Sequence, residues 1–253
     1  MTVRRLLLAF ALVSPLILVA SWRYSVPAAL GQMLLSHLLV LYATLRPNVQ
    51  WLGEVVTCFE TDRREVWLTI DDGPSSDTRA ILEVLARHSV QATFFVKGSL
   101  ALQNRADVEA ILADGHSVAN HSFSHPSGTF WCLPPQRIAA EIDQGNAALE
   151  SISGAPQRWF RAPVGMKNPA VHPALRKRNM RLIGWTVRGF DAVLTDANEI
   201  IGRIVHRLRP GAIIVLHQGR KHSASVIEKV IVALRERGYA FVVPDDSRLK
   251  TSM

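Results

Sequence analysis

The stretch "LTIDDGPSSDT", residues 68–78, joins an apolar run to two adjacent acids, a glycine and a proline. Val66–Ile70 has the composition of a buried strand, and the glycine and proline favour a turn after it. Asp77–His88 has the periodicity of a helix with one apolar face, made of Ile81, Leu82, Val84 and Leu85. Taken alone, Asp71 and Asp72 are typical of a solvated turn, so a chemical role requires partners elsewhere in the chain.

The same alternation of apolar runs and amphipathic stretches continues to residue 243. Further helices are expected at about 98–114, 134–152, 168–178, 196–208 and 223–237. Further strands are expected at 91–96, 117–120, 158–162, 181–187, 212–216 and 239–243. This spacing predicts βαβ units and a parallel sheet, either doubly wound or closed as a barrel. In both architectures, ligand sites gather at the carboxyl ends of the strands.

Titratable side chains stand at or just beyond the ends of five predicted strands: Asp71 and Asp72, His121, Arg161, Asp191 and His217. A random distribution of charged residues would not be expected to place one behind each of these strands. We therefore predict that the carboxyl-terminal edge of the sheet carries a polar site.

The segment "HSFSH", residues 121–125, contributes two histidines four positions apart. Such a pair alone is typical of ordinary loop imidazoles, but Asp72 adds a carboxylate. Two imidazoles and one carboxylate leave a coordination position open for water, as in hydrolytic metal sites. We predict Asp72, His121 and His125 as metal ligands. Zinc is expected from this ligand set, and cobalt, nickel or manganese also fit it.

Metal-bound water needs a base, and Asp71 adjoins the predicted ligand Asp72. A nearby cation would lower the pKa of this carboxylate and hold it ionised. Arg161 is the candidate for that cation, although most arginines are solvated surface residues. We expect Arg161 to lie against Asp71.

Hydrolysis of an amide also needs a proton for the leaving amine. His217, which ends the apolar strand "AIIVLH", is the candidate general acid, and Asp191 would orient its ring and raise its pKa. A lone histidine there would more often be a core or loop residue, and the predicted metal set favours the acid role. Oxyanion stabilisation would come from the metal and a backbone N–H in "RAPVG", residues 161–165.

These motifs resemble those of the polysaccharide deacetylases with a NodB homology domain, carbohydrate esterase family 4, over about residues 66–243. The segments that carry the resemblance are "TIDDG" (69–73), "HSFSH" (121–125), "RAPVG" (161–165) and "VLH" (215–217), with Asp191 in a weaker one. The resemblance implies a distorted (β/α) barrel of about seven parallel strands and N-deacetylation of an acetamido sugar. It implies Asp71 as the base, Arg161 as its partner and His217 as the acid. It also implies the three metal ligands predicted above, and it places the N–H of Val164 at the oxyanion.

The sequence departs from the family pattern where the substrate would bind. Val164 stands in place of an aromatic residue, and Trp185 is the candidate for part of the lost aromatic wall. In "RGFDA", residues 188–192, Asp191 remains, but Arg188 replaces an acid and Ala192 replaces a tryptophan.

The basic residues Arg188, Arg220 and Lys221 have two interpretations. They belong to a solvated loop, or they bind an anionic group such as the phosphate of a lipid-linked sugar.

The N-terminal region contains two apolar stretches, Leu6–Trp22 and Ser25–Leu45. The second is long enough to span a bilayer, whereas the first is marginal and has a poor signal-peptidase site. We expect association with a membrane, the bacterial inner membrane in our interpretation. The flanking arginines are too few to determine the side of the domain, and the extracytoplasmic side is our working expectation.

The 253 residues, 48% of them hydrophobic, suffice for one main domain. Residues 1–53 hold four of the 29 basic and none of the 21 acidic residues, so half of the net charge of +8 is N-terminal. The sequence has no run of basic residues with interleaved aromatic residues, the pattern typical of nucleic-acid binding. Cys58 and Cys132 are either a pair or two separate thiols. We divide the chain into an anchor region (1–50), a linker (51–65), a catalytic domain (66–243) and a tail (244–253).

The leading hypothesis is a metal-dependent N-deacetylase acting on an envelope glycan or a lipid-linked precursor. One alternative is cleavage of another small amide, such as a formamide, by the same groups. The other is a non-catalytic, glycan-binding membrane protein, although all the expected catalytic groups are present. The sequence does not determine the sugar or the oligomeric state.

Overall fold

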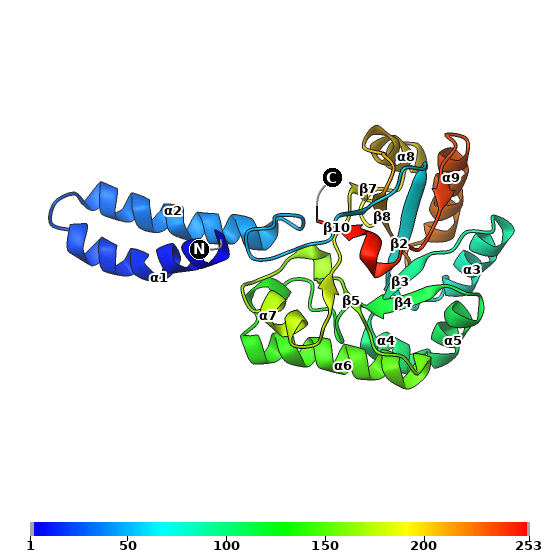
Figure 1. Cartoon of the computed structure of the whole chain (residues 1–253), viewed down its shortest axis with the longest axis horizontal. Helices are drawn as coiled ribbons and strands as arrows, with labels where there is room; N and C mark the ends of the chain where they lie inside the picture. The colour runs from blue at the N-terminus through cyan, green and yellow to red at the C-terminus, as the bar shows by residue number, and fades with distance from the viewer. Residues whose placement is uncertain (1–2, 252–253) are drawn as a thin grey trace.

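The computed structural model describes residues 3–251, and Figure 1 shows a helical hairpin attached to an α/β domain. Strand β2 (Glu65–Gly73) lies inside a 10-stranded sheet formed by the described residues. The strand order is β10-β1-β8-β2-β3-β4-β5-β6, with β7 beside β8 and β9 beside β2. The other strands are β1 (Cys58–Phe59), β3 (Thr93–Val96), β4 (Ser117–Asn120), β5 (Trp159–Phe160), β6 (Arg181–Leu182), β7 (Val187–Arg188), β8 (Ala212–His217), β9 (Ala240–Phe241) and β10 (Leu249–Lys250).

Helices follow most of the parallel strands and pack outside the sheet. They are α3 (Thr78–Arg87), α4 (Gly98–Gln103), α5 (Arg105–Ala113), α6 (Pro135–Ser153), α7 (Val171–Arg176), α8 (Ala197–His206) and α9 (Ser223–Arg235), with short 3-10 turns η1 (Phe130–Cys132), η2 (Pro163–Gly165) and η3 (Asp246–Arg248). The apolar face predicted for α3 is buried in the core between the sheet and helices α3, α5, α8 and α9.

Alternation along the strands separates an outer and an inner face of the sheet. In β2, Val66, Leu68 and Ile70 join the core under the helices, whereas Trp67 joins a second core inside the curled sheet. Strand β8 follows the same rule, with Val215 inside. Because side chains alternate with a period of two, the next inward positions lie at the carboxyl ends of these strands.

The curled sheet closes into a distorted barrel through the segment before β1. Val56 forms a parallel bridge with Ile183, just after β6, while Cys58 in β1 pairs with β8. Lys250 in β10 pairs in turn with β1. The segments 51–65 and 244–253, expected to be a linker and a tail, therefore contribute strands, and the α/β barrel prediction is confirmed.

Two predicted elements are interrupted. The helix expected at 98–114 divides into α4 and α5 at Asn104, whose side chain donates a hydrogen bond to the carbonyl of Leu100 and competes with the helical backbone. The strand expected at 181–187 divides into β6 and β7, because the carbonyls of Ile183 and Gly184 accept hydrogen bonds from a buried side chain, Arg161.

The N-terminal hairpin consists of α1 (Val3–Ser21) and α2 (Val26–Leu45), which extend away from the barrel (Figure 1). Both helices are long and apolar enough to cross a membrane, and only 11% and 22% of their apolar windows are buried. Such helices occur in membrane anchors and, near an N-terminus, in signal sequences. The helices contact each other through Gln32, which donates to the carbonyl of Ser14, and Arg4 in α1 donates to the carbonyl of Pro169 in the barrel domain.

The two cysteines are not bonded to each other. Cys58 is buried in β1, and Cys132 is exposed in η1.

Candidate active site and metal centre

The two adjacent acids that end β2 both face the site, although neighbours in a regular strand point to opposite faces. Asp71 is the next inward position after Trp67 and Thr69. At Asp72 the backbone adopts φ +78°, and the register with β3 shifts between Asp71 and Gly73. This irregularity turns the Asp72 carboxylate back toward the site, a type of backbone strain that occurs at functional positions.

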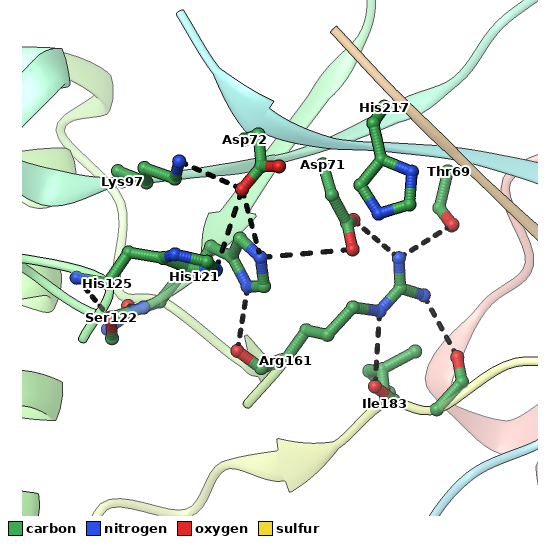
Figure 2. Close-up of polar contacts among 12 residues, drawn as sticks. Thr69, Asp71, Asp72, Lys97, His121, Ser122, His125, Arg161, Ile183 and His217 are labelled. Carbon is green, nitrogen blue, oxygen red and sulfur yellow. Dashed lines mark hydrogen bonds and ion pairs between the residues drawn. The ribbon is translucent and has the colours of Figure 1, made fainter. Parts of the chain in front are cut away.

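Asp72, His121 and His125 form a compact set of potential metal ligands (Figure 2). Their ligand atoms lie within 4.8 Å of one another. Nε2 of His125 lies 3.5 Å and Nε2 of His121 lies 3.8 Å from Oδ1 of Asp72. Tetrahedral zinc with bonds of about 2.1 Å would separate its ligand atoms by about 3.4 Å. The set therefore fits a divalent metal with a small adjustment.

The protonation of the two histidines suits a metal. Nδ1 of His121 lies 2.9 Å from the carbonyl oxygen of Arg161, so the proton on Nδ1 leaves Nε2 free to coordinate. Burial lowers the pKa of His121 to about 4. Burial and the neighbouring His121 lower the pKa of His125 to about 3. Both imidazoles are therefore neutral near pH 7, the form that binds a metal.

The loop that carries the histidines is held by its own polar residues. Ser122 and His125 have φ of +64° and +53°. The Ser122 hydroxyl accepts a hydrogen bond from the N–H of His125, and the Ser124 hydroxyl donates to the carboxylate of Glu141. These bonds stabilise a turn that brings both rings to one side.

Lys97, which was not among the predicted site residues, makes a direct ion pair with the predicted ligand Asp72. Its Nζ lies 2.9 Å from Oδ1 of Asp72, yet this buried oxygen accepts no well-directed hydrogen bond among the described residues. The same oxygen also faces the Nε2 atoms of His121 and His125, an arrangement that suits a shared metal. Burial opposes, but His121, Lys97 and His125 together hold the pKa of Asp72 well below its usual range. Lys97 directly follows β3, so the rule of polar residues at strand ends could have identified it.

Asp71 lies against Arg161, as predicted. Nη1 of Arg161 donates to Oδ1 of Asp71 over 2.6 Å and to the hydroxyl of Thr69 over 2.8 Å. Nε and Nη2 donate to the carbonyls of Ile183 and Gly184, and the guanidinium lies 4.0 Å above the ring centroid of Phe95. Arg161 is 0% exposed, so these partners replace its water.

Arg161 lowers the pKa of Asp71, as expected, but burial has the larger effect and sets the net direction. Burial raises the pKa of Asp71, and the charge of Arg161 only opposes that rise. A carboxyl group with a raised pKa is a stronger base than an ordinary aspartate, which suits proton abstraction near neutral pH. Arg161 thus limits the rise and holds the carboxylate in place.

His217 ends β8 beside Asp71, its partner in the β2–β8 register. Its Nδ1 lies 3.0 Å from Oδ1 of Asp191, whose Oδ2 accepts a hydrogen bond from the backbone N–H of His217. Burial would lower the pKa of His217, but the hydrogen bond and charge of Asp191, with Asp71 and Asp72, raise it. The contact with Asp191 and the raised pKa suit the general-acid role, which remains a prediction for His217.

A cavity of about 380 Å³ opens over these residues. The three predicted substrate-binding residues, Val164, Trp185 and Arg188, all contribute to its wall. Val164 has φ +56° and is 38% exposed, whereas Trp185 is 8% exposed. Of the basic loop, Arg220 lines this cavity, while Lys221 lines an adjoining one of about 300 Å³.

The distorted barrel, the three potential metal ligands and the Asp71–Arg161 pair are the features of one class, the barrel hydrolases that can hold a metal through two histidines and one aspartate. Sequence comparison then identifies the family. The family profile described as polysaccharide deacetylase matches residues 59–183. The chain belongs to this family, and the resemblance drawn from the motifs is confirmed.

Two curated relatives illustrate the match. The chain is 30% identical over 195 residues to a chitooligosaccharide deacetylase of Azorhizobium caulinodans, covering 71% of this chain and 92% of that protein. It is 32% identical over 188 residues to a peptidoglycan N-acetylglucosamine deacetylase of Listeria monocytogenes, covering 74% of this chain but only 39% of the relative.

A solved structure shares the fold as well. A carbohydrate esterase family 4 pseudoenzyme from Bacillus anthracis has a TM-score of 0.67 and 27% identity, with 73% of this chain and 65% of that chain covered. Because the fold also occurs in a pseudoenzyme, the groups in the site must carry the argument for catalysis.

Proposed function

We propose that this protein is a metal-dependent N-deacetylase that hydrolyses the acetamide group of an N-acetylated sugar. One observation carries the proposal. Asp71 and Asp72 are adjacent in sequence, face one site, and have different partners: a buried arginine for Asp71, and His121 and His125 for Asp72. The relatives named as deacetylases support the choice of an acetamide.

Each residue of the site has a proposed role in the reaction. Asp72, His121 and His125 would hold a divalent metal, zinc by its preference for this donor set, which supplies Lewis acidity toward a carbonyl and lowers the pKa of water. Asp71 accepts a proton, with Arg161 fixing its carboxylate. His217, oriented by Asp191, donates a proton to the leaving amine nitrogen. Trp185 and Val164 shape the wall against the sugar, and the N–H of Val164 is the proposed donor to the oxyanion.

The proposed location is a membrane, with an N-acetylated glycan of the envelope, in polymeric or lipid-linked form, as substrate. The helices α1 and α2 support an anchor that stays attached, because α1 contacts both α2 and the barrel domain. If both helices span the bilayer, the N-terminus and the barrel lie on the same side.

The proposal is tested by acetate release. The full chain, purified in detergent and reloaded with zinc, is incubated with N-acetylglucosamine oligomers and with a polyprenyl-linked N-acetylglucosamine. We expect acetate release that a chelator abolishes and zinc restores. A protein that binds zinc but releases no acetate from either substrate contradicts the proposal and favours a pseudoenzyme. Formate release from N-formyl substrates alone would favour a deformylase.

A further inference from the structure

The C-terminal end of helix α2 is packed directly onto the wall of the catalytic cavity. Buried Lys167, two residues after η2, holds this junction: its backbone N–H donates to the carbonyl of Thr44. Its ammonium group donates to the carbonyls of Arg46 and Pro47 over 2.7 and 2.8 Å. These carbonyls end a helix, where a cation is favourable. The helix is therefore fastened to the barrel without a flexible tether.

The residues that follow α2 also touch residues of the cavity wall. A Cβ placed on Gly165 would meet the Trp185 ring at 2.5 Å and the Pro47 side chain at 2.7 Å, so Gly165 is wedged between them. Gly165 and Trp185 both line the cavity. Asn48 donates a hydrogen bond to the carbonyl of Trp185 over 2.7 Å. Pro47 therefore packs against Gly165, a residue of the cavity wall.

Aromatic and basic residues mark where the bilayer surface would meet this junction. Near the end of α2, the ring of Tyr42 packs against that of Trp51, and the Arg46 guanidinium lies over Tyr42. The opposite end of the hairpin carries exposed Trp22 and Tyr24. Aromatic residues gather in this way at membrane interfaces. The 20 residues of α2 span about 30 Å, the thickness of a hydrocarbon core.

The mouth of the cavity combines exposed apolar residues with cations. Beyond residue 46, the described chain has five large hydrophobic residues that are exposed, and three of them are Val164, Phe190 and Val193. Val164 and Val193 line the cavity, and Phe190 lies under the Arg188 guanidinium. The buried Nε of Arg188 has no hydrogen-bond partner among the described residues. This combination suits a ligand with an anionic group next to an apolar chain.

Resting on the proposed N-deacetylase function, we infer that the substrate is a membrane-embedded amphiphile: an N-acetylated sugar joined through phosphate to a lipid chain, in the leaflet that faces the barrel. The rigid junction at Lys167 holds the cavity at the bilayer surface. Val193 contacts the lipid-proximal part of the substrate, and Arg188 with Arg220 binds the phosphate. A long polymer outside the membrane would use neither feature.

The test uses the full chain, loaded with zinc, in phosphatidylethanolamine and phosphatidylglycerol vesicles. Acetate release is compared among three substrates: N-acetylglucosamine linked through diphosphate to a polyprenyl chain, the same sugar as a soluble nucleoside diphosphate ester, and neutral chitotetraose. We expect kcat/KM for the lipid-linked sugar to exceed both soluble values at least tenfold. The nucleoside ester separates the contribution of phosphate from that of lipid.

Two variants test the mouth of the cavity. Val193→Ser changes a side chain that is 76% exposed, so it leaves the fold intact, and Arg188→Gln removes one cation. Each is expected to reduce the preference for the lipid-linked sugar at least threefold. Arg87→Gln, which alters an exposed arginine at the far end of α3, is the matched control and should leave the preference unchanged.

The outcomes separate the two proposals. Acetate release from chitotetraose as efficient as from the lipid-linked sugar, or an unchanged preference in both variants, overturns the inference and leaves the deacetylase function standing. A zinc-loaded protein that releases no acetate from any of the three substrates overturns the proposed function, and the inference falls with it.

Discussion

Arg161 donates a 2.6 Å hydrogen bond to Asp71 in a place where neither residue is more than 3% exposed. Ion pairs removed from water are sensitive to the loss of one partner, because the remaining charge is left buried without compensation. The pair therefore links the stability of the barrel to the proposed base.

Replacing Arg161 should affect both activity and stability. Arg161→Ala is expected to cost about 3–5 kcal/mol of unfolding free energy by stranding a buried carboxylate. Arg161→Lys should retain more stability but lower kcat at least tenfold, because an ammonium cannot reach Asp71, Thr69 and two carbonyls at once. Thermal unfolding in detergent and acetate release measure the two effects. Arg178→Lys, at a more exposed pair with Asp143, is the control and should be nearly neutral.

Substitutions of the two adjacent acids, Asp71 and Asp72, should have different effects on zinc binding and turnover. Asp72→Ala removes a ligand and is expected to lose bound zinc, whereas Asp71→Asn should keep the zinc and lose turnover because the amide cannot accept the proton. Zinc content after dialysis and acetate release are measured on the same preparations. Equal zinc loss in both variants would contradict the division of roles between these residues.

The proposed role of His217 as the general acid predicts how activity falls at alkaline pH. A general acid must be protonated, so activity should fall as the pH rises through the pKa of His217, which is raised mainly by the hydrogen bond and charge of Asp191 against the effect of burial. Asp191→Asn removes that negative charge, and the pKa of His217 should drop. The alkaline limb of the kcat profile should then move to lower pH. An unmoved limb in this variant would exclude His217 as the group that titrates there.

Lys97 should compete with the metal. Its ammonium lies 2.9 Å from Oδ1 of Asp72, an oxygen that the metal would need. Lys97→Met removes the competing cation and is expected to tighten zinc binding several-fold, which calorimetric titration of the metal-free protein measures. Weaker binding in the variant would mean that Lys97 supports the metal site instead.

The helical hairpin predicts the topology of the chain. If both α1 and α2 span the bilayer, reporters fused before Met1 and after Met253 should report the same compartment. Reporters in opposite compartments would indicate a single span, and the loss of the N-terminal reporter by processing would indicate a signal sequence. The result also identifies the leaflet available to the cavity.

Much of the site was predictable because parallel strands bring their carboxyl ends to one edge. Side chains alternate between the two faces along a strand, so Asp71 and His217 lie on the inner face of the sheet. His121 and Arg161 occupy equivalent positions after β4 and β5. Lys97 follows from the same rule. The departures from the family pattern at Val164 and Arg188 could also be read from the sequence, and both residues lie in the cavity wall.

The sequence by itself determined the parallel α/β class, the family and the residue types of the site, because these depend on local periodicity and short motifs. Only the tertiary structure decided that Val56 closes the barrel through Ile183, that Asp72 turns back toward the histidines, and that burial outweighs Arg161 in setting the pKa of Asp71. It also decided that Lys167 fastens α2 beside the cavity. Each of these depends on contacts between residues far apart in the chain, or on how much water the fold excludes, and local sequence patterns carry neither.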